Sequence, residues 1–320
     1  MRVILLGPQR RPTVDAVARS LGLGREDLDG PVATVTAGWQ EREPDDGELT
    51  ALLGGRAVNL SLYRRWLDVQ ERDPQYAADG RGLVGTLAEL QDLYLLRLDY
   101  ALRAVYAVQR RAVAGSEVDA DAFSEAVAAV RELDDMHLRR VNGVRGEFYA
   151  RFPPHERAVI AGHREEVAAM LRDSSALVVA GGHVGVLADV LHLFNVAAFV
   201  GSTVIAWSAG AMALTDRIVL FHDRSPQGPG HPEVYGSGLS VLRDMVLLPH
   251  ARARLLLDDT PRMEVFARRF APARCVLLES GTRIELDRGG GGGDGTSDAT
   301  WPPGLRVIAA DGRVTSLEAA

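Results

Sequence analysis

The stretch 204–212 limits the fold of this chain more than any other part of the sequence. Its apolar run Val204–Trp207 predicts a buried strand, Ser208 follows within a cluster of small residues, and a helical pattern begins directly afterwards. A strand, a serine and a helix in this order predict a nucleophile elbow, a strained turn that requires small residues two positions before and after the serine. Ala206 and Gly210 meet that requirement. The alternative is a buried strand that ends in an ordinary small-residue turn.

Apolar strands alternate with helical segments on both sides of this stretch. Further strands are expected at Val3–Leu6, Val32–Thr36, Ala176–Ala180, Ile218–Phe221, Met245–Leu248 and Val276–Leu278. Helical spacing of apolar residues marks Thr13–Leu21, Glu156–Leu171 and Val184–Phe194. This alternation predicts an α/β fold with a mainly parallel sheet and helices on both faces.

Residues 60–150 interrupt the alternation and predict a helical insertion in an α/β domain that spans residues 1–285. Apolar residues recur at helical spacing from Leu83 to Val108, and Val118–Leu138 predicts a second helix after the break at Gly115. Two helices joined by a short turn predict an antiparallel hairpin. The hairpin would cover a face of the sheet, act as a lid, or join two copies in a homodimer.

Three segments with few apolar residues complete the plan of the chain. Asp223–Gly238 is rich in Gly, Pro and Ser and predicts an exposed loop. Residues 286–304 contain a run of glycines and predict a flexible linker. Residues 305–320 carry two short apolar runs around Asp311 and Gly312, which predict a terminal β-hairpin.

Composition excludes several classes of function. The net charge of −7 and the pI near 5.7 argue against a nucleic acid partner. No run of about twenty apolar residues predicts a membrane span, and the chain opens on a strand pattern without a signal peptide. We therefore expect a cytoplasmic protein without a membrane partner.

The chemistry of the chain is limited further by its basic residues and its single thiol. All 36 basic residues are arginine, which excludes Schiff-base chemistry, a Ser–Lys dyad and a P-loop lysine. Cys275 stands alone, so no internal disulfide or cysteine metal cluster can form. The histidines lack the helical spacing of a zinc site, and we expect neither a metal nor a cofactor.

A serine nucleophile needs a base, and that base needs a carboxylate to orient it. His250 is the best candidate base because it ends an apolar run, so we expect it at the carboxyl end of a strand, on the sheet edge that carries Ser208. Glu279 closes the next apolar run and could orient the imidazole. Asp216 and Asp223 are the rival carboxylates. The alternative for His250 is a turn residue before a short helix.

The same reaction needs hydrogen-bond donors for the developing oxyanion. The amide of Ala209, one position after the serine, is one expected donor. The amides of Gly181 and Gly182 are the other candidates because no side chain would block approach to them. The alternative for these glycines is a tight strand-to-helix turn. His183 would then be either a substrate contact or an exposed residue at the start of a helix.

Two further groups are candidate substrate contacts. Trp39 and Gln40 follow the second strand, at the sheet edge where ligands bind in open parallel sheets, although a solvated surface turn is the alternative. Arg252 and its neighbour Arg254 could pair with a substrate carboxylate, and the alternative is a surface charge.

Four segments together resemble the dipeptidase E and cyanophycinase family of serine peptidases. These segments are Ala180–His183, Ala206–Ala211, Leu248–His250 and Leu278–Gly281. The resemblance implies a class I glutamine amidotransferase-like fold, with Ser208 as nucleophile, His250 as base and Glu279 as the acidic member. It also implies substrates cleaved after aspartate. The family usually has glycine at position 206 and asparagine at position 183, and the helical insertion has no counterpart in its short members.

Two functions are therefore expected for this chain. The first is a serine hydrolase that acts on a small peptide or related amide through an acyl-enzyme on Ser208. The alternative is a non-catalytic member of the same fold that binds a ligand or a partner. Glutamine amidotransferase chemistry is disfavoured because it needs a cysteine nucleophile, and Cys275 lies in an apolar strand, where a buried inert thiol is expected.

Overall fold

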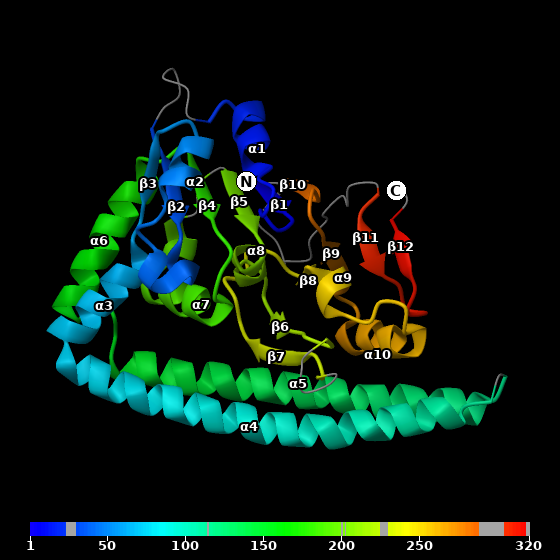
Figure 1. Cartoon of the computed structure of the whole chain (residues 1–320). Coiled ribbons are helices and arrows are strands. Elements are labelled where there is room, and N and C mark those ends of the chain that lie inside the picture. Colours follow the sequence, from blue (N-terminus) through cyan, green and yellow to red (C-terminus); the bar gives the residue numbers. More distant parts are fainter. Residues whose placement is uncertain are drawn as a thin grey trace.

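A six-stranded sheet forms the centre of the protein in the computed structural model (Figure 1), which describes residues 1–23, 30–113, 115–199, 201, 203–224, 230–287 and 304–317. Its strand order is β10 (Arg283–Asp287), β1 (Arg2–Leu6), β5 (Thr203–Trp207), β4 (Ala176–Val179), β2 (Val32–Val35) and β3 (Ala57–Asn59). The neighbours from β1 to β3 are parallel, and β10 is antiparallel to β1. The predicted α/β fold with a mainly parallel sheet is confirmed.

Helices cover both faces of this sheet because its central strands are apolar on both sides. On one face, Ile4 and Ile205 belong to a cluster with α1 (Val14–Ser20) and α2 (Gly47–Leu52). On the other face, neighbouring strand residues pack with α6 (Ala158–Arg172), α7 (Val184–Leu193) and α8 (Ala209–Ala213). Alternate side chains of a strand point to opposite faces, which explains why uninterrupted apolar runs form these strands.

A second sheet holds the two strands that precede His250 and Glu279. Its order is β12 (Val314–Ser316), β11 (Arg306–Ile308), β9 (Arg274–Leu278) and β8 (Met245–Pro249). Strands β8 and β9 are parallel, and β11 and β12 form the predicted C-terminal β-hairpin. The expectation that the strand before His250 shares a sheet with Ser208 is wrong. Strand β10 pairs with β1 at that edge, and β8 pairs with β9 in the second sheet instead.

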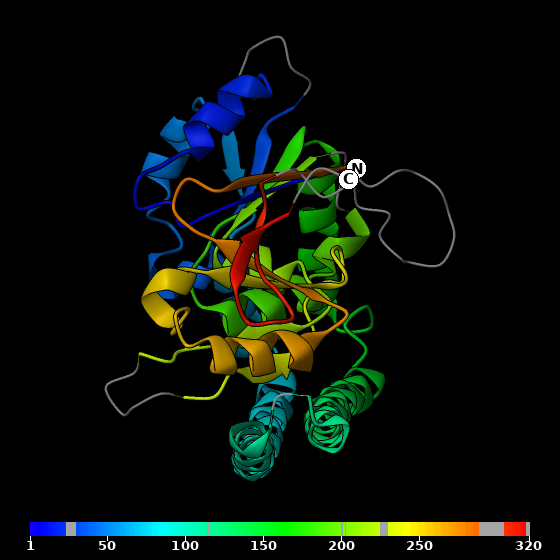
Figure 2. The same ribbon diagram turned by 90° about the vertical axis from the view of Figure 1, so that its right-hand side faces the viewer.

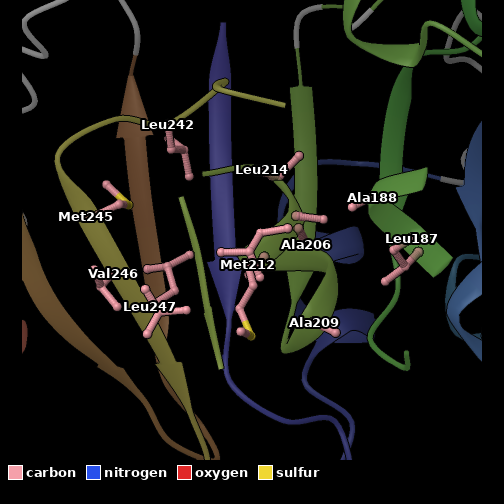
Figure 3. Close-up of a cluster of buried hydrophobic side chains, with 14 of the residues drawn as sticks. Leu187, Ala188, Ala206, Ala209, Met212, Leu214, Leu242, Met245, Val246 and Leu247 are labelled. Atoms are coloured by element: carbon pink, nitrogen blue, oxygen red, sulfur yellow. The ribbon is translucent and has the colours of Figure 1, made fainter. Parts of the chain in front are cut away.

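Packing of side chains connects β8 to the central sheet in place of a strand pairing. Met212 and Leu214 lie in and directly after α8. Figure 3 shows them beside Ala206 of β5, facing Val246 and Leu247 of β8. All five side chains are buried. The short helix α8 therefore lies between the strand that carries Ser208 and the strand that leads to His250.

The two long helices of the insertion extend further than the sequence pattern predicts. The insertion contains α3 (Leu62–Arg72), α4 (Pro74–Arg111) and α5 (Glu117–Arg151), and the predicted end of the second helix at Leu138 falls well before Arg151. The helix continues because Val141 and Phe148 extend its apolar face into the same core. Asp73 and Ser116 cap the N-termini of α4 and α5 by accepting hydrogen bonds from backbone amides.

Helices α4 and α5 form the predicted antiparallel hairpin, which covers neither face of the central sheet. Figure 1 shows the hairpin beyond the carboxyl ends of the central strands, below α7, α8, β6 (Ile218–Leu220) and β7 (Glu233–Gly236), and Figure 2 shows the two helices end-on. A buried network connects it to α10 (Thr260–Phe270), where Arg269 donates hydrogen bonds to Asp134 and to the hydroxyl of Tyr94. Leu93, Leu96 and Tyr100 stay exposed on α4, and self-association through the insertion stays a prediction.

The expected exposed loop Asp223–Gly238 is partly wrong. Residues 225–229 lie outside the described residues, but Glu233–Gly236 forms β7, which pairs with β6. Val234 is fully buried and its amide donates a hydrogen bond to Tyr94. The loop therefore becomes a strand where it meets the helical insertion, a contact that local composition cannot show. The predicted glycine-rich linker falls mainly on residues 288–303, outside the described residues.

Candidate functional site

Ser208 lies in a strained turn between β5 and α8. Its backbone has φ 50° and ψ −123°, a positive φ that costs about 1–3 kcal/mol for a residue other than glycine. The neighbouring strand approaches the turn closely, since a Cβ atom on Gly210 would lie 2.4 Å from the carbonyl oxygen of Val179. Ala206 is fully buried, whereas Ser208 is partly exposed. Strand, strained serine and helix follow one another as in a nucleophile elbow.

The turn after β4 lies directly beside Ser208. A Cβ atom on Gly181 would be 3.0 Å from the Cβ atom of Ser208. Gly182 has φ 133°, and a Cβ atom there would collide with the backbone of Gly38. No hydrogen bond within the described part of the chain uses the amide N–H of Gly181 or Gly182. Two glycine amides without an acceptor therefore lie close to the serine, where an oxyanion would need donors.

His250 begins the short helix α9 (Ala251–Arg254) and also has a positive φ, with φ 57° and ψ 33°. Pro249 before it is paired in register with Leu278, whose carbonyl oxygen accepts a hydrogen bond of 3.2 Å from the His250 amide. These contacts fix the backbone of His250 beside the turn that carries Glu279.

The surroundings of His250 favour its neutral form. Burial lowers the pKa of its imidazole, and the positive charges of Arg254 and Arg10 lower it further, while the negative charge of Glu279 has the opposite effect. A neutral imidazole at neutral pH can accept a proton, as a general base must.

Glu279 connects the two sheets through its backbone and its carboxylate. Its Oε1 atom accepts a hydrogen bond of 2.7 Å from the amide of Arg252, at the start of α9. Its carbonyl oxygen lies so close to Gly7 that a Cβ atom there would be 1.7 Å away. Because β1 pairs with β5, with Leu6 opposite Trp207, Gly7 follows at the same edge as Ser208. The Glu279 turn therefore contacts both the start of α9 and the end of β1, the strand that pairs with β5.

The two rival carboxylates have other partners or other surroundings. Asp223 is fully buried and accepts hydrogen bonds from the guanidinium of Arg262 and the amide of Leu256. Asp216 follows α8, and burial raises the pKa of its carboxyl. Neither carboxylate contributes to the pKa shift of His250, whereas Glu279 does.

The predicted substrate contacts fall in different places. His183 is exposed and caps α7, because its Nδ1 atom accepts a hydrogen bond of 3.2 Å from the Val186 amide. Trp39 packs partly against the apolar cluster on the α1 face of the sheet. Gln40 has φ 56° and ψ −122°, close to the conformation of Ser208, and lines a cavity below the sheet edge. The side chain of Arg252 is exposed.

Sequence reasoning missed Arg10 and Gly7. Arg10 lies in the segment after β1, and its charge acts on His250. Gly7 is the position where the Glu279 turn crosses the end of β1. Both follow the first strand at the carboxyl edge of the sheet, so the position of the strand end was a signal that could have identified them.

The described residues contain no group of three or more His, Cys, Asp or Glu side chains arranged to hold a metal ion. Within the same residues, no helix combines the length and the apolar character needed to cross a membrane.

The similarity of this chain to known proteins is found among solved structures. No family model and no curated protein matches the sequence. A similar solved structure is the crystal structure of a peptidase from an acI-B1 Actinobacterium, with 12% sequence identity and a TM-score of 0.45 over 99% of this chain and 94% of that chain. A similarity at this level assigns neither a family nor an activity, so the function has to be argued from the site itself.

Proposed function

We propose that this chain is a serine hydrolase that cleaves a small peptide or related amide through an acyl-enzyme on Ser208. The observation that carries the proposal is the strained backbone of Ser208 at the end of β5, with the Gly181–Gly182 turn packed beside it. Strain of this kind persists where the surrounding structure enforces it, and it concentrates at functional sites.

In the proposed reaction, the Oγ atom of Ser208 attacks the substrate carbonyl carbon while its proton passes to the imidazole of His250. The amides of Ala209 and of the Gly181–Gly182 turn donate hydrogen bonds to the oxyanion. The carbon–nitrogen bond then breaks, and the imidazole returns the proton to the leaving amine. Water activated by the same imidazole hydrolyses the ester on Ser208 and restores the free enzyme.

Glu279 is proposed to orient and stabilise the imidazole. Its charge favours the protonated form of His250, which is the form that appears during the reaction. The bond that it accepts from the Arg252 amide holds one carboxylate oxygen in place. Asp223 is a poorer candidate, because Arg262 already occupies its carboxylate.

The finer assignment is also a proposal: a member of the dipeptidase E and cyanophycinase family with a class I glutamine amidotransferase-like fold. Support comes from the four resembling segments, which lie at or beside strand ends in the structure. His183, Trp39, Gln40 and Arg252 are the proposed substrate contacts around them.

The experiment is a screen of N-terminal aspartyl dipeptides and β-aspartyl peptides, together with dipeptides that begin with apolar residues, using wild type and Ser208→Ala side by side. We expect hydrolysis of at least one peptide by wild type and a loss of about a thousandfold or more in Ser208→Ala. Ser240→Ala is the matched control, since Ser240 also has a positive φ of 53° but its amide donates a hydrogen bond to the carbonyl oxygen of Thr215, beyond the end of α8. Equal rates for Ser208→Ala and wild type would contradict the proposal and favour a non-catalytic binding protein.

A further inference from the structure

A cavity of about 530 Å³ lies between the helical insertion and α7. Its walls come from α3, α4, α5 and α7, and Gln40 lies at one side. The volume is within the range of about 300–1,000 Å³ that is typical of small-molecule sites. Helices α3, α4 and α5 supply most of the lining residues, so the cavity depends on the helical insertion.

Aromatic side chains from three helices form part of the cavity wall. Trp66 on α3, Tyr76 on α4, and Phe148 and Tyr149 on α5 all line it. Tyr76 contacts Phe148 edge to face, with ring centroids 5.3 Å apart, and Phe148 contacts Tyr149 at 5.7 Å. The rings hold one another in position, so the wall is preformed and offers flat apolar surfaces to a planar or bulky apolar group.

The polar groups of the wall suit a neutral ligand better than a charged one. Arg145 donates a hydrogen bond of 2.7 Å to Asp189, so the charges of these two wall residues balance each other. Arg81, the remaining charged wall residue, is exposed, so water and salt screen its charge. Burial raises the pKa of Tyr76 and of Tyr149, which keeps both phenols protonated at neutral pH. Neither hydroxyl forms a hydrogen bond with another described residue, so both are available to a ligand.

The backbone connects this cavity to the elbow. Gln40 lines the cavity, and Gly38, two residues before it, packs on Gly182 and accepts a hydrogen bond of 2.8 Å from the His183 amide. Val186, on the first turn of the helix that starts after His183, is also a wall residue. The turn that borders Ser208 therefore continues directly into the rim of the cavity.

Gln40 is the residue at this junction with an unusual conformation. Its φ of 56° is rare for a residue other than glycine, and no described residue forms a hydrogen bond with its side-chain amide. A strained position that presents an unused amide at the mouth of a cavity is suited to hold a polar group of a bound molecule.

We propose that this cavity binds a neutral, bulky apolar group of the substrate, such as an aromatic side chain, while Gln40 contacts the adjoining peptide or amide group. The inference rests on the proposed function, because it deepens the substrate class of the Ser208 site. The preferred substrates are then small peptides or amides with an aromatic or large aliphatic group, and an aspartyl group is disfavoured in this cavity.

The test uses a variant that fills the cavity and a matched variant that does not. Gly80 lines the cavity and has open space where a Cβ atom would lie, so Gly80→Leu would fill part of it. Gly82, two residues further along α4, also has open space but is not a wall residue, and Gly82→Leu is the control. Both substitutions replace a helix glycine with a good helix former, so neither should unfold α4.

Binding is measured first, in a background that cannot turn the ligand over. With the Ser208→Ala protein, calorimetry should show phenylalanyl-alanine binding at least about tenfold more tightly than aspartyl-alanine. Gly80→Leu should weaken binding of phenylalanyl-alanine about tenfold, whereas Gly82→Leu should leave it unchanged. If Gly80→Leu does not fold by circular dichroism, Leu87→Trp is a second filling variant on the same helix.

Equal affinity for the two dipeptides, or equal binding by the two leucine variants, would overturn the inference. Hydrolysis by the protein with an intact Ser208 is then measured separately. If phenylalanyl-alanine binds in the cavity but is not cleaved, the proposed function fails and the cavity stands. If Ser208-dependent cleavage occurs without any preference for the aromatic peptide, the proposed function stands and the cavity inference fails.

Discussion

The elbow and the helical insertion, two neighbouring regions of this protein, are built on different physical principles. Around Ser208 the backbone segments pack so closely that Gly181, Gly182 and Gly210 have no room for a side chain without movement of neighbouring atoms. In the insertion, Gly80 and Gly143 lie in helices with open space around them. The elbow is therefore held by contacts between backbone atoms, and the insertion by contacts between side chains.

This difference shows which region can vary. Close backbone packing fixes the position of a nucleophile and its donors, and it tolerates almost no change in side-chain volume. Helices that meet through side chains can change the shape of the cavity between them without moving the elbow. We infer that the reaction is determined by the elbow and the substrate class by the insertion.

The largest expected effect breaks the side-chain network that joins the insertion to the body. Asp134 and Arg269 are almost completely buried and paired at 2.7 Å, so Asp134→Ala leaves an uncompensated guanidinium. We expect a loss of about 3–5 kcal/mol in the free energy of unfolding, measured by urea denaturation. The neighbouring variant Asp135→Ala removes a partly exposed pair with Arg217 and should change stability by less than about 1 kcal/mol. Equal losses would show that the buried network does not anchor the insertion.

A pair of glycine substitutions tests the comparison between the two regions. Gly210→Ala places a Cβ atom 2.4 Å from one backbone oxygen and 2.5 Å from another, so we expect about 1–3 kcal/mol of destabilisation and loss of activity. Gly143→Ala, in the middle of α5, meets no atom within 4 Å and should stabilise the protein by about 0.5–1 kcal/mol. Thermal unfolding measures both variants. A tolerated alanine at position 210 would mean that the elbow is looser than its geometry indicates.

The smallest expected effect concerns the pH dependence of the base. Burial and nearby arginines lower the pKa of His250, so activity should rise with pH, and the pH at half-maximal activity should lie below the usual histidine value near 6.5. Arg254→Gln removes one positive charge and should raise that pKa, which moves the acid limb of kcat/KM to higher pH. The exposed Arg252 does not act on His250, so Arg252→Gln should leave the limb in place. A shift in both variants or in neither would show that Arg254 does not act on the base.

The sequence predicts the strand-to-helix turn at Ser208 well because the determinants of that turn are local. An apolar run, a serine and small residues on both sides lie within nine positions, and the structure places Ser208 on a turn with positive φ. The strand pairing of the His250 segment depends on distant partners, and the same apolar pattern suits either sheet. The antiparallel strand β10 occupies the edge of the central sheet, and nothing near Met245–Leu248 records that fact.

Contacts between distant segments also explain what the sequence could not predict about the insertion and the site. The strand at Glu233–Gly236 exists because Val234 and Tyr94 meet across 140 positions of sequence. The cavity forms only when α3, α4, α5 and α7 come together. From the sequence alone, the aromatic residues of the cavity wall would be assigned to an ordinary core. Apolar residues recur at the same helical spacing whether the helix face packs tightly or lines a cavity.

Covalent labelling shows whether Ser208 is an activated nucleophile. The wild-type protein is treated with a fluorophosphonate, and the adduct is located by mass spectrometry of the digested peptides. We expect one adduct on Ser208, unchanged labelling in Ser240→Ala, and slower labelling in His250→Ala. An unlabelled Ser208 at high probe concentration in the folded protein, or an adduct at another serine, would contradict the proposed role of Ser208.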